Sequence, residues 1–302
     1  MQMWEPPGKP KVLISFAYYH KTNIDLMAGG LNHPFFVADS GAFSAMTKGL
    51  EITVENYARW LKRWKQNFDF YFNLDVIRDW KASERNLRRL QEHGLDPVPV
   101  FHTGSPWEVF EQICSEHSLV SLGGMAGKHM GMDTLLRWLV HCFKIARDHG
   151  TKIHGLGMTT TKLNASLPFY SIDSTSWVAG SMYGCLLVFD GHGKLKQASM
   201  SNPQSVKKIA PLIREHGLDP EKFYNRDHYH WTDAVTLGAR SYWKYEEWLR
   251  KRHGPIEIEG KLPGLNLCLV AGSPQIIGHA FMDNYEEAKA WSKTLRHEEA
   301  YL

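Results

Sequence analysis

The stretch Phe35-Phe36-Val37-Ala38-Asp39-Ser40-Gly41-Ala42-Phe43 carries the pattern that decides the fold. Four apolar residues run without interruption into an acidic turn that contains glycine, and an amphipathic segment follows over 51–68. In that segment apolar side chains recur at helical spacing, at Val54, Tyr57, Leu61, Trp64 and Phe68. A continuously apolar strand that leads through a loop into a helix is typical of a parallel sheet covered on both faces.

The same unit of strand, loop and helix recurs along the chain. We predict strands at 12–16, 35–38, 70–74, 98–101, 119–122, 153–157, 169–172 and 186–189. Between them, helical periodicity also predicts helices over 83–93, 105–117 and 132–149. Eight strands that alternate with helices indicate an α/β fold, a closed (β/α)8 TIM-like barrel rather than an open sheet.

The alternation of predicted strands and helices ends after Gly193. We therefore assign residues 1–193 to the barrel and its active site, and residues 194–302 to a C-terminal α-rich extension packed on the barrel. Within the extension we expect helices over 205–216, 232–252 and 285–297, and one further strand over 265–270. The extension is also where we place candidate nucleic-acid contacts.

Bulk composition sets limits on the class of protein. The chain has 302 residues, of which 43% are hydrophobic and 22% charged, so a sizeable core is expected. A net charge of +3 and a pI near 8.5 are only mildly basic, which permits a phosphate-backbone partner without demanding one. We see neither an apolar run of about 18 residues nor a secretory signal, and expect a cytoplasmic protein without a membrane partner.

The four cysteines, Cys114, Cys142, Cys185 and Cys268, are scattered and form no Cys-x-x-Cys motif. Buried free thiols are the expected outcome, and a cysteine-rich zinc site is not indicated. We expect no metal and no cofactor.

Acidic and glycine-rich residues follow the predicted strands at their carboxyl ends. They are Asp39-Ser40-Gly41-Ala42-Phe43, Asn73-Leu74-Asp75, His102, Gly123-Gly124-Met125, Gly155-Leu156-Gly157 and Asp173. In a (β/α) barrel this end of the sheet carries the active site. Two carboxylates that meet there support displacement at a sugar carbon, where one attacks the anomeric centre and the other protonates the leaving group. The residues alone predict a glycosyl-transferring or glycosyl-hydrolysing enzyme.

Each of these motifs also fits a purely structural role. Asp39-Ser40-Gly41 is typical of a turn or a helix start, and Asp75 has Arg78 nearby as an ion-pair partner. Gly123-Gly124 fits a tight loop, and His102 fits a histidine of the core or of the barrel rim whose ring nitrogens are hydrogen-bonded and that has no catalytic role. Their coincidence at successive strand ends is what favours a site.

The order of these motifs resembles that of the tRNA-guanine transglycosylase family over residues 12–180. The resemblance rests on Asp39-Ser40-Gly41-Ala42-Phe43, Phe72-Asn73-Leu74-Asp75, Gly123-Gly124-Met125-Ala126-Gly127, Gly155-Leu156-Gly157 and Tyr170-Ser171-Ile172-Asp173. It implies that Asp173 attacks the anomeric carbon and that Asp39 is the general acid and then the general base. The implied base-binding residues are Asp75, His102, Gly123, Gly124, Met125, Ser40 and Phe43.

The chain departs from the family pattern at three places. His102 stands where the family usually has a Gln, Ala42 stands for the second Gly of the first motif, and the family's Cys-x-Cys-x-x-Cys…His zinc site is missing. The compact pattern is more similar to the 7-deazaguanine DNA transglycosylases of phages and bacterial modification islands. This resemblance implies that guanine in DNA is exchanged for a base like 7-cyano-7-deazaguanine, after the target nucleotide leaves the stack.

Three other interpretations stay open. The polymer is tRNA instead of DNA; or the enzyme is a nucleoside or glycoside hydrolase with water as acceptor; or the barrel only binds nucleic acid or a partner. For the strand contact we single out Arg226, His228, His230 and Trp231, a cluster that equally fits a helix-start loop with ordinary packing.

Overall fold

The computed structural model describes residues 8–125, 130–225, 228–261, 264–282, 284–297 and 301. Its central element is an eight-stranded sheet in the order β3-β2-β1-β10-β7-β6-β5-β4, in which every ladder is parallel. The strands are β1 (Lys11–Ser15), β2 (Phe35–Asp39), β3 (Phe70–Tyr71), β4 (Val100–His102), β5 (Leu119–Gly123), β6 (Lys152–Gly155), β7 (Ser171–Ser174) and β10 (Asn266–Val270).

The sheet is curled and TIM-like, but its ladders do not run through a full circle. Among the described residues, the two edges of the sheet are joined by a single parallel bridge, between Phe72 just after β3 and Val98 just before β4. In that bridge the amide of Asn73 donates to the Val98 carbonyl at 2.9 Å, and the amide of Val98 donates to the Tyr71 carbonyl at 2.8 Å. The prediction of an α/β fold with a parallel TIM-like sheet is confirmed, whereas the closed barrel is not reached, because β3 contributes only two residues to a ladder.

The prediction that 186–189 forms the eighth strand of the sheet is wrong. This segment is β8 (Cys185–Phe189), which pairs antiparallel with β9 (Leu195–Ser199) in a separate two-stranded sheet. Leu186 and Val188 pack into a small core of their own, while alternate residues of β8 are less buried. The eighth strand is instead β10, which lies between β1 and β7 and comes from the segment that we assigned to the extension.

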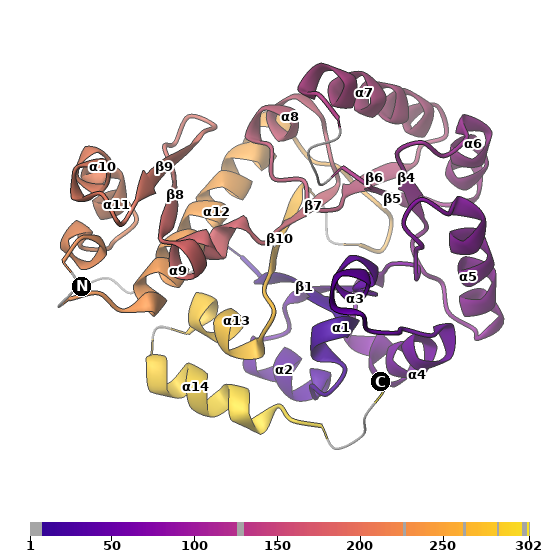
Figure 1. The fold of residues 1–302 in the computed structure, drawn as a ribbon. Helices are drawn as coiled ribbons and strands as arrows, with labels where there is room; N and C mark the ends of the chain where they lie inside the picture. Colours follow the sequence, from indigo (N-terminus) through magenta and orange to yellow (C-terminus); the bar gives the residue numbers. More distant parts are fainter. Residues whose placement is uncertain are drawn as a thin grey trace.

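Helices lie around the outside of the curled sheet and in an insertion to one side of it (Figure 1). They are α1 (Phe16–Tyr19), α2 (Ile24–Gly30), α3 (Ala42–Lys48), α4 (Val54–Trp64), α5 (Trp80–Glu92), α6 (Trp107–Glu116), α7 (Met132–Asp148), α8 (Thr161–Ser166), α9 (Ala179–Tyr183), α10 (Pro203–Lys208), α11 (Ala210–Glu215), α12 (Trp231–His253), α13 (Pro274–Phe281) and α14 (Tyr285–Thr294), with short 3-10 turns η1 (Lys65–Asn67), η2 (Ser176–Val178) and η3 (Pro220–Phe223). The predicted helices are confirmed to within a few residues, except that 205–216 is divided into α10 and α11. None of the described helices has the length and apolarity that crossing a membrane requires.

The hairpin β8–β9, with α9, α10 and α11, is inserted between β7 and the helix α12 that leads into β10. Figure 1 shows this insertion to one side of the curled sheet, with α12 between the two. Helix α12 contacts β8 and α9 as well as β10 and α13. At Gly238 it approaches η2 so closely that a Cβ atom would lie 1.9 Å from the Trp177 carbonyl oxygen. The chain therefore leaves the sheet after β7, builds the insertion and returns through α12.

The interior of the curl is filled by alternate strand residues, which point to one face of the sheet. They form a cluster separate from the core under the helices, and include Leu13, Phe35, Val37, Phe70, Phe72, Val98, Val100, Leu119, Tyr170 and Cys268. Polar residues replace apolar ones in this series towards the carboxyl ends of the strands, at Ser15, Asp39, His102 and Asp173. The change from apolar to polar marks the end of the sheet at which chemistry is expected.

Candidate active site

Three carboxylates converge at the carboxyl ends of the parallel strands. Asp39 is the last residue of β2, Asp173 lies in β7, and Asp75 follows β3. Burial, together with the negative charges of Asp75 and Asp173, raises the pKa of Asp39 to about 7, from an ordinary value of 3.8. The structure thus brings together the acidic residues that the strand-end series singled out, and one of them holds its proton near neutral pH.

The turn after Asp39 is built around its carboxyl group. Oδ2 of Asp39 accepts a hydrogen bond from the amide of Gly41 at 2.9 Å. Gly41 has a φ of +78°, and a Cβ atom there would lie 2.4 Å from Oγ of Ser15, so only glycine fits. Ser40 is fully buried and its hydroxyl accepts from the Ala42 amide at 3.3 Å, which is a local turn contact. Phe43 is 61% exposed at the start of α3.

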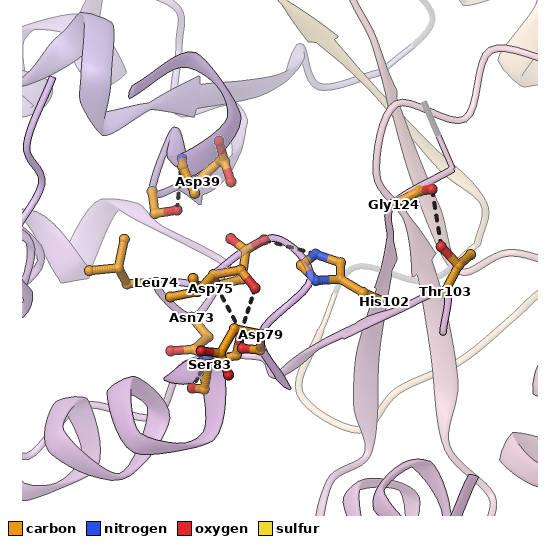
Figure 2. Close-up of polar contacts among 12 residues, drawn as sticks. Asp39, Asn73, Leu74, Asp75, Asp79, Ser83, His102, Thr103 and Gly124 are labelled. Atoms are coloured by element: carbon orange, nitrogen blue, oxygen red, sulfur yellow. Dashed lines mark hydrogen bonds and ion pairs between the residues drawn. The ribbon is translucent and has the colours of Figure 1, made fainter. Parts of the chain in front are cut away.

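Asp75 pairs with His102 across the gap between β3 and β4. Nε2 of His102 lies 2.9 Å from Oδ2 of Asp75, and the two side chains are only 8% and 9% exposed. Figure 2 shows the imidazole reaching from β4 to Asp75, with Asp39 on a neighbouring segment. Gly123 makes room for this ring, since a Cβ atom there would lie 2.5 Å from Cδ2 of His102. The expected alternative, a pair between Asp75 and Arg78, does not occur among the described ion pairs.

The loop that presents Asp75 is held by polar groups of α5, which the sequence did not single out. The side-chain amide of Asn73 donates to the Ser83 carbonyl at 2.7 Å, and the hydroxyl of Ser83 accepts from the Val76 amide at 2.8 Å. Asn86 donates to the Leu74 carbonyl at 2.8 Å. These contacts, several of them drawn in Figure 2, fix the backbone on both sides of Asp75. In the sequence, these contacts are indicated only by the polar residues near the end of the predicted strand at 70–74 and those of the nearby predicted helix.

Asp173 is held by a different set of donors. Its Oδ1 atom accepts from the Gly157 amide at 2.9 Å and contacts Nε2 of His154 at 3.1 Å. Gly157 has a φ of +61°, which points its amide at the carboxylate. The sequence predicts His154 only as part of an apolar strand; the signal that marks it is a histidine directly before the glycine-rich strand end Gly155-Leu156-Gly157.

Tyr57 is a further residue that the sequence placed only in the packing face of a helix. Its hydroxyl donates to the Phe72 carbonyl at 2.9 Å, at the bridge between β3 and the segment before β4. Burial and the charges of Asp39 and Asp75 raise the pKa of Tyr57 well above its ordinary value. A neutral phenol therefore lies close to these two carboxylates.

The glycine-rich loop after β5 is described only in part. Gly124 has a φ of +73°, and its carbonyl accepts from the hydroxyl of Thr103 at 3.3 Å. Met125 is partly buried against the core. Ala126 and Gly127, which belong to the same motif, lie outside the described residues.

The candidate strand-contact cluster is at the start of α12. Arg226 lies outside the described residues, and His228 and His230 are exposed. Trp231, the first residue of α12, packs edge-on against His279 with ring centroids 4.9 Å apart, and His230 packs on Tyr285 at 5.0 Å. None of the described contacts joins this cluster to the carboxylates, and its aromatic rings tie α12 to α13 and α14.

The four cysteines carry free thiols, three of them buried. Within the ranges that the structure describes, no group of three or more His, Cys, Asp or Glu side chains is placed to hold a metal ion. In comparisons with known proteins, no protein-family model and no curated protein matches the chain.

Proposed function

We propose that this protein is a base-exchange transglycosylase that replaces guanine in DNA with a 7-deazaguanine through a covalent glycosyl-enzyme on Asp173. The observation that carries the proposal is the contrast between two carboxyl groups at one end of the sheet. Asp39 has a pKa of about 7 and can give up a proton at neutral pH. Asp173 accepts two N–H donors on one oxygen and is oriented by them. Different surroundings for two carboxyl groups are what an acid and a nucleophile require.

The two groups divide the exchange into two half-reactions. In the first, an oxygen of Asp173 bonds to the anomeric carbon while the bond to the departing base breaks, and the base takes the proton of Asp39. In the second, the incoming base gives its N–H proton to the carboxylate of Asp39, and its nitrogen displaces Asp173. Because both bases are purine-like, the same residues serve both directions.

The Asp75–His102 pair is the proposed base-recognition group. With Nε2 of His102 donating to Oδ2, the other oxygen of Asp75 accepts from the amino-pyrimidinone edge of a guanine or 7-deazaguanine. Nδ1 of His102 is then an acceptor. The Gln that the family usually has at this position would instead offer both a donor and an acceptor through its side-chain amide. The close fit of His102 against Gly123 supports a fixed orientation of this pair.

DNA is the favoured polymer because the cysteine motif that accompanies tRNA recognition in the related family is missing from the sequence. A base in duplex DNA is unreachable until its nucleotide rotates out of the stack. The exposed His228 and His230 are proposed to contact the displaced strand or its backbone.

Base exchange with two polymers tests the proposal. Purified protein is incubated with duplex DNA or with unmodified tRNA, each with labelled guanine or 7-cyano-7-deazaguanine, and label in the precipitated polymer is counted. Label in DNA is the expected result. Label only in tRNA would replace DNA by tRNA as substrate, and release of free base without incorporation would identify a hydrolase.

A further inference from the structure

A buried polar network lies inside the curled sheet next to Asp173. Ser171 and Asp173 are two residues apart on β7 and therefore point to the same face. His154 on β6 pairs in register with Ser171. Its Nδ1 atom lies 2.7 Å from Oγ of Ser171, and its Nε2 atom lies 3.1 Å from Oδ1 of Asp173. One imidazole thus bridges a serine and the proposed nucleophile.

The surroundings of this imidazole are apolar and closed to solvent. His154 and Ser171 are both 0% exposed. The ring of Phe72 lies 4.7 Å from the imidazole and that of Phe70 lies 6.0 Å from it, measured between ring centroids. Polar atoms in such a place are costly unless they are hydrogen-bonded, and here both ring nitrogens have partners.

The partners determine the direction of the hydrogen bonds. A neutral imidazole has one donor and one acceptor, and an ionised carboxylate only accepts. Nε2 of His154 therefore carries the hydrogen that Asp173 accepts, and Nδ1 accepts from the Ser171 hydroxyl. We assign this tautomer from the network.

Both donors to Asp173 reach the same oxygen. Oδ1 accepts from His154 and from the Gly157 amide, whereas no donor among the described residues reaches Oδ2. We propose that His154 is a positioning residue: through Oδ1 it fixes the plane of the Asp173 carboxylate so that Oδ2 faces the anomeric carbon, and the Ser171 hydroxyl donates to the ring nitrogen that carries no hydrogen.

This inference rests on the proposed function, since it concerns the attack by Asp173. Oδ2 forms the bond to the anomeric carbon as the carbon–nitrogen bond breaks, and the base leaves with the electron pair and the Asp39 proton. Oδ1 becomes the carbonyl oxygen of the ester-like glycosyl-enzyme and keeps both donors. His154 neither gives nor takes a proton and does not touch the substrate.

Two substitutions of different chemistry separate positioning from packing. His154→Gln keeps an N–H donor near the end of the side chain, while His154→Leu has no donor. For His154→Leu we expect kcat of base exchange to fall about 100-fold, with KM for DNA changed by less than about threefold. For His154→Gln we expect kcat within about tenfold of wild type. A Leu variant as active as wild type, or a Gln variant as impaired as the Leu variant, would overturn the proposal.

A measurement without substrate tests the same network. In protein labelled with [15N]histidine, long-range 1H–15N correlation spectra at pH 8 should show the His154 hydrogen on Nε2. Ser171→Ala should leave the hydrogen on Nε2, because the Asp173 carboxylate still accepts from it, and should change the 15N shift of Nδ1, which loses its donor. A wild-type ring with its hydrogen on Nδ1 would overturn the positioning role even if base exchange occurs, whereas wild-type protein that modifies no polymer would overturn the proposed function before any variant is compared.

Discussion

The imidazole of His102 lies with Nε2 2.9 Å from Oδ2 of Asp75, and both side chains are almost completely buried. This pair spans the place where the curled sheet has a single bridge instead of a ladder, between β3 and β4. The Asp75–His102 side-chain pair is therefore a second link between the β3 and β4 edges of the sheet, in addition to the backbone bridge between Phe72 and Val98. The pair therefore links two edges of the sheet and also forms part of the proposed base-binding site.

Gly123→Ala should disrupt the Asp75–His102 pair although neither Asp75 nor His102 is substituted. The added Cβ atom would lie 2.5 Å from Cδ2 and 2.7 Å from Nε2 of His102, so the ring must move away from Asp75. We expect KM for the incoming base to rise about 10- to 100-fold, the cost of one buried charge-assisted hydrogen bond. Gly131→Ala, where a Cβ atom meets nothing within 4 Å, is the control and should leave KM unchanged. Equal KM values for the two variants would contradict the role of the pair.

Asp39→Asn should stabilise the protein at alkaline pH. The folded pKa of Asp39, about 7, lies above its ordinary value of 3.8, so the favourable protonated state is fully present below about pH 4 and is lost as pH rises through 7. Relative to the Asn variant, wild type should lose about 1–2 kcal/mol of unfolding free energy between pH 4 and pH 8, after allowance for solvent screening. Urea unfolding of both proteins at pH 4 and pH 8 measures these free energies. A difference between wild type and Asp39→Asn that is the same at both pH values would refute the raised pKa of Asp39.

The first half-reaction should depend on the same titration. Departure of the base needs the proton of Asp39, so a burst of released guanine, measured before steady state, should slow about tenfold per pH unit above pH 7. The expected profile is flat below that point. A burst rate that stays constant from pH 6 to pH 9 would exclude Asp39 as the general acid.

Gly238→Ala tests the packing of α12 against η2. A Cβ atom would lie 1.9 Å from the Trp177 carbonyl oxygen, which is backbone and cannot turn aside. We expect a loss of about 3 kcal/mol or more of unfolding free energy. Gly29→Ala in α2 has open space around its Cβ position and should be neutral or slightly stabilising in the same urea titration. Comparable stabilities for the two variants would show that α12 is not fixed at this point.

Periodicity in the sequence was sufficient to predict most of the sheet and most of the outer helices. Strand assignments succeeded where an apolar run ended in a polar turn, as at Asp39 and His102. They failed at β8, because a strand of a two-stranded hairpin with one buried face has the same short apolar run. Counting strands in order then put β10 outside the sheet, since sequence spacing does not show that an insertion separates β7 from α12.

For the site, the order of strand ends predicted which carboxyl groups would meet, because parallel strands finish at one edge. It did not predict their partners. His154 and Tyr57 looked like packing residues, and the pairing of Asp75 with His102 instead of Arg78 depends on how β3 and β4 face each other across the curl. Contacts between distant strands and helices decide these partners, and local pattern carries little information about them.

The measurement that tests the central claim most directly is incorporation of labelled 7-cyano-7-deazaguanine into duplex DNA by wild type and by Asp173→Asn. Asp148→Asn, at an exposed position on α7, is the matched control. The account predicts label in DNA with wild type and with Asp148→Asn, and a loss of at least about 1,000-fold with a folded Asp173→Asn protein. Undiminished incorporation by Asp173→Asn would show that Asp173 is not the nucleophile and would contradict the account.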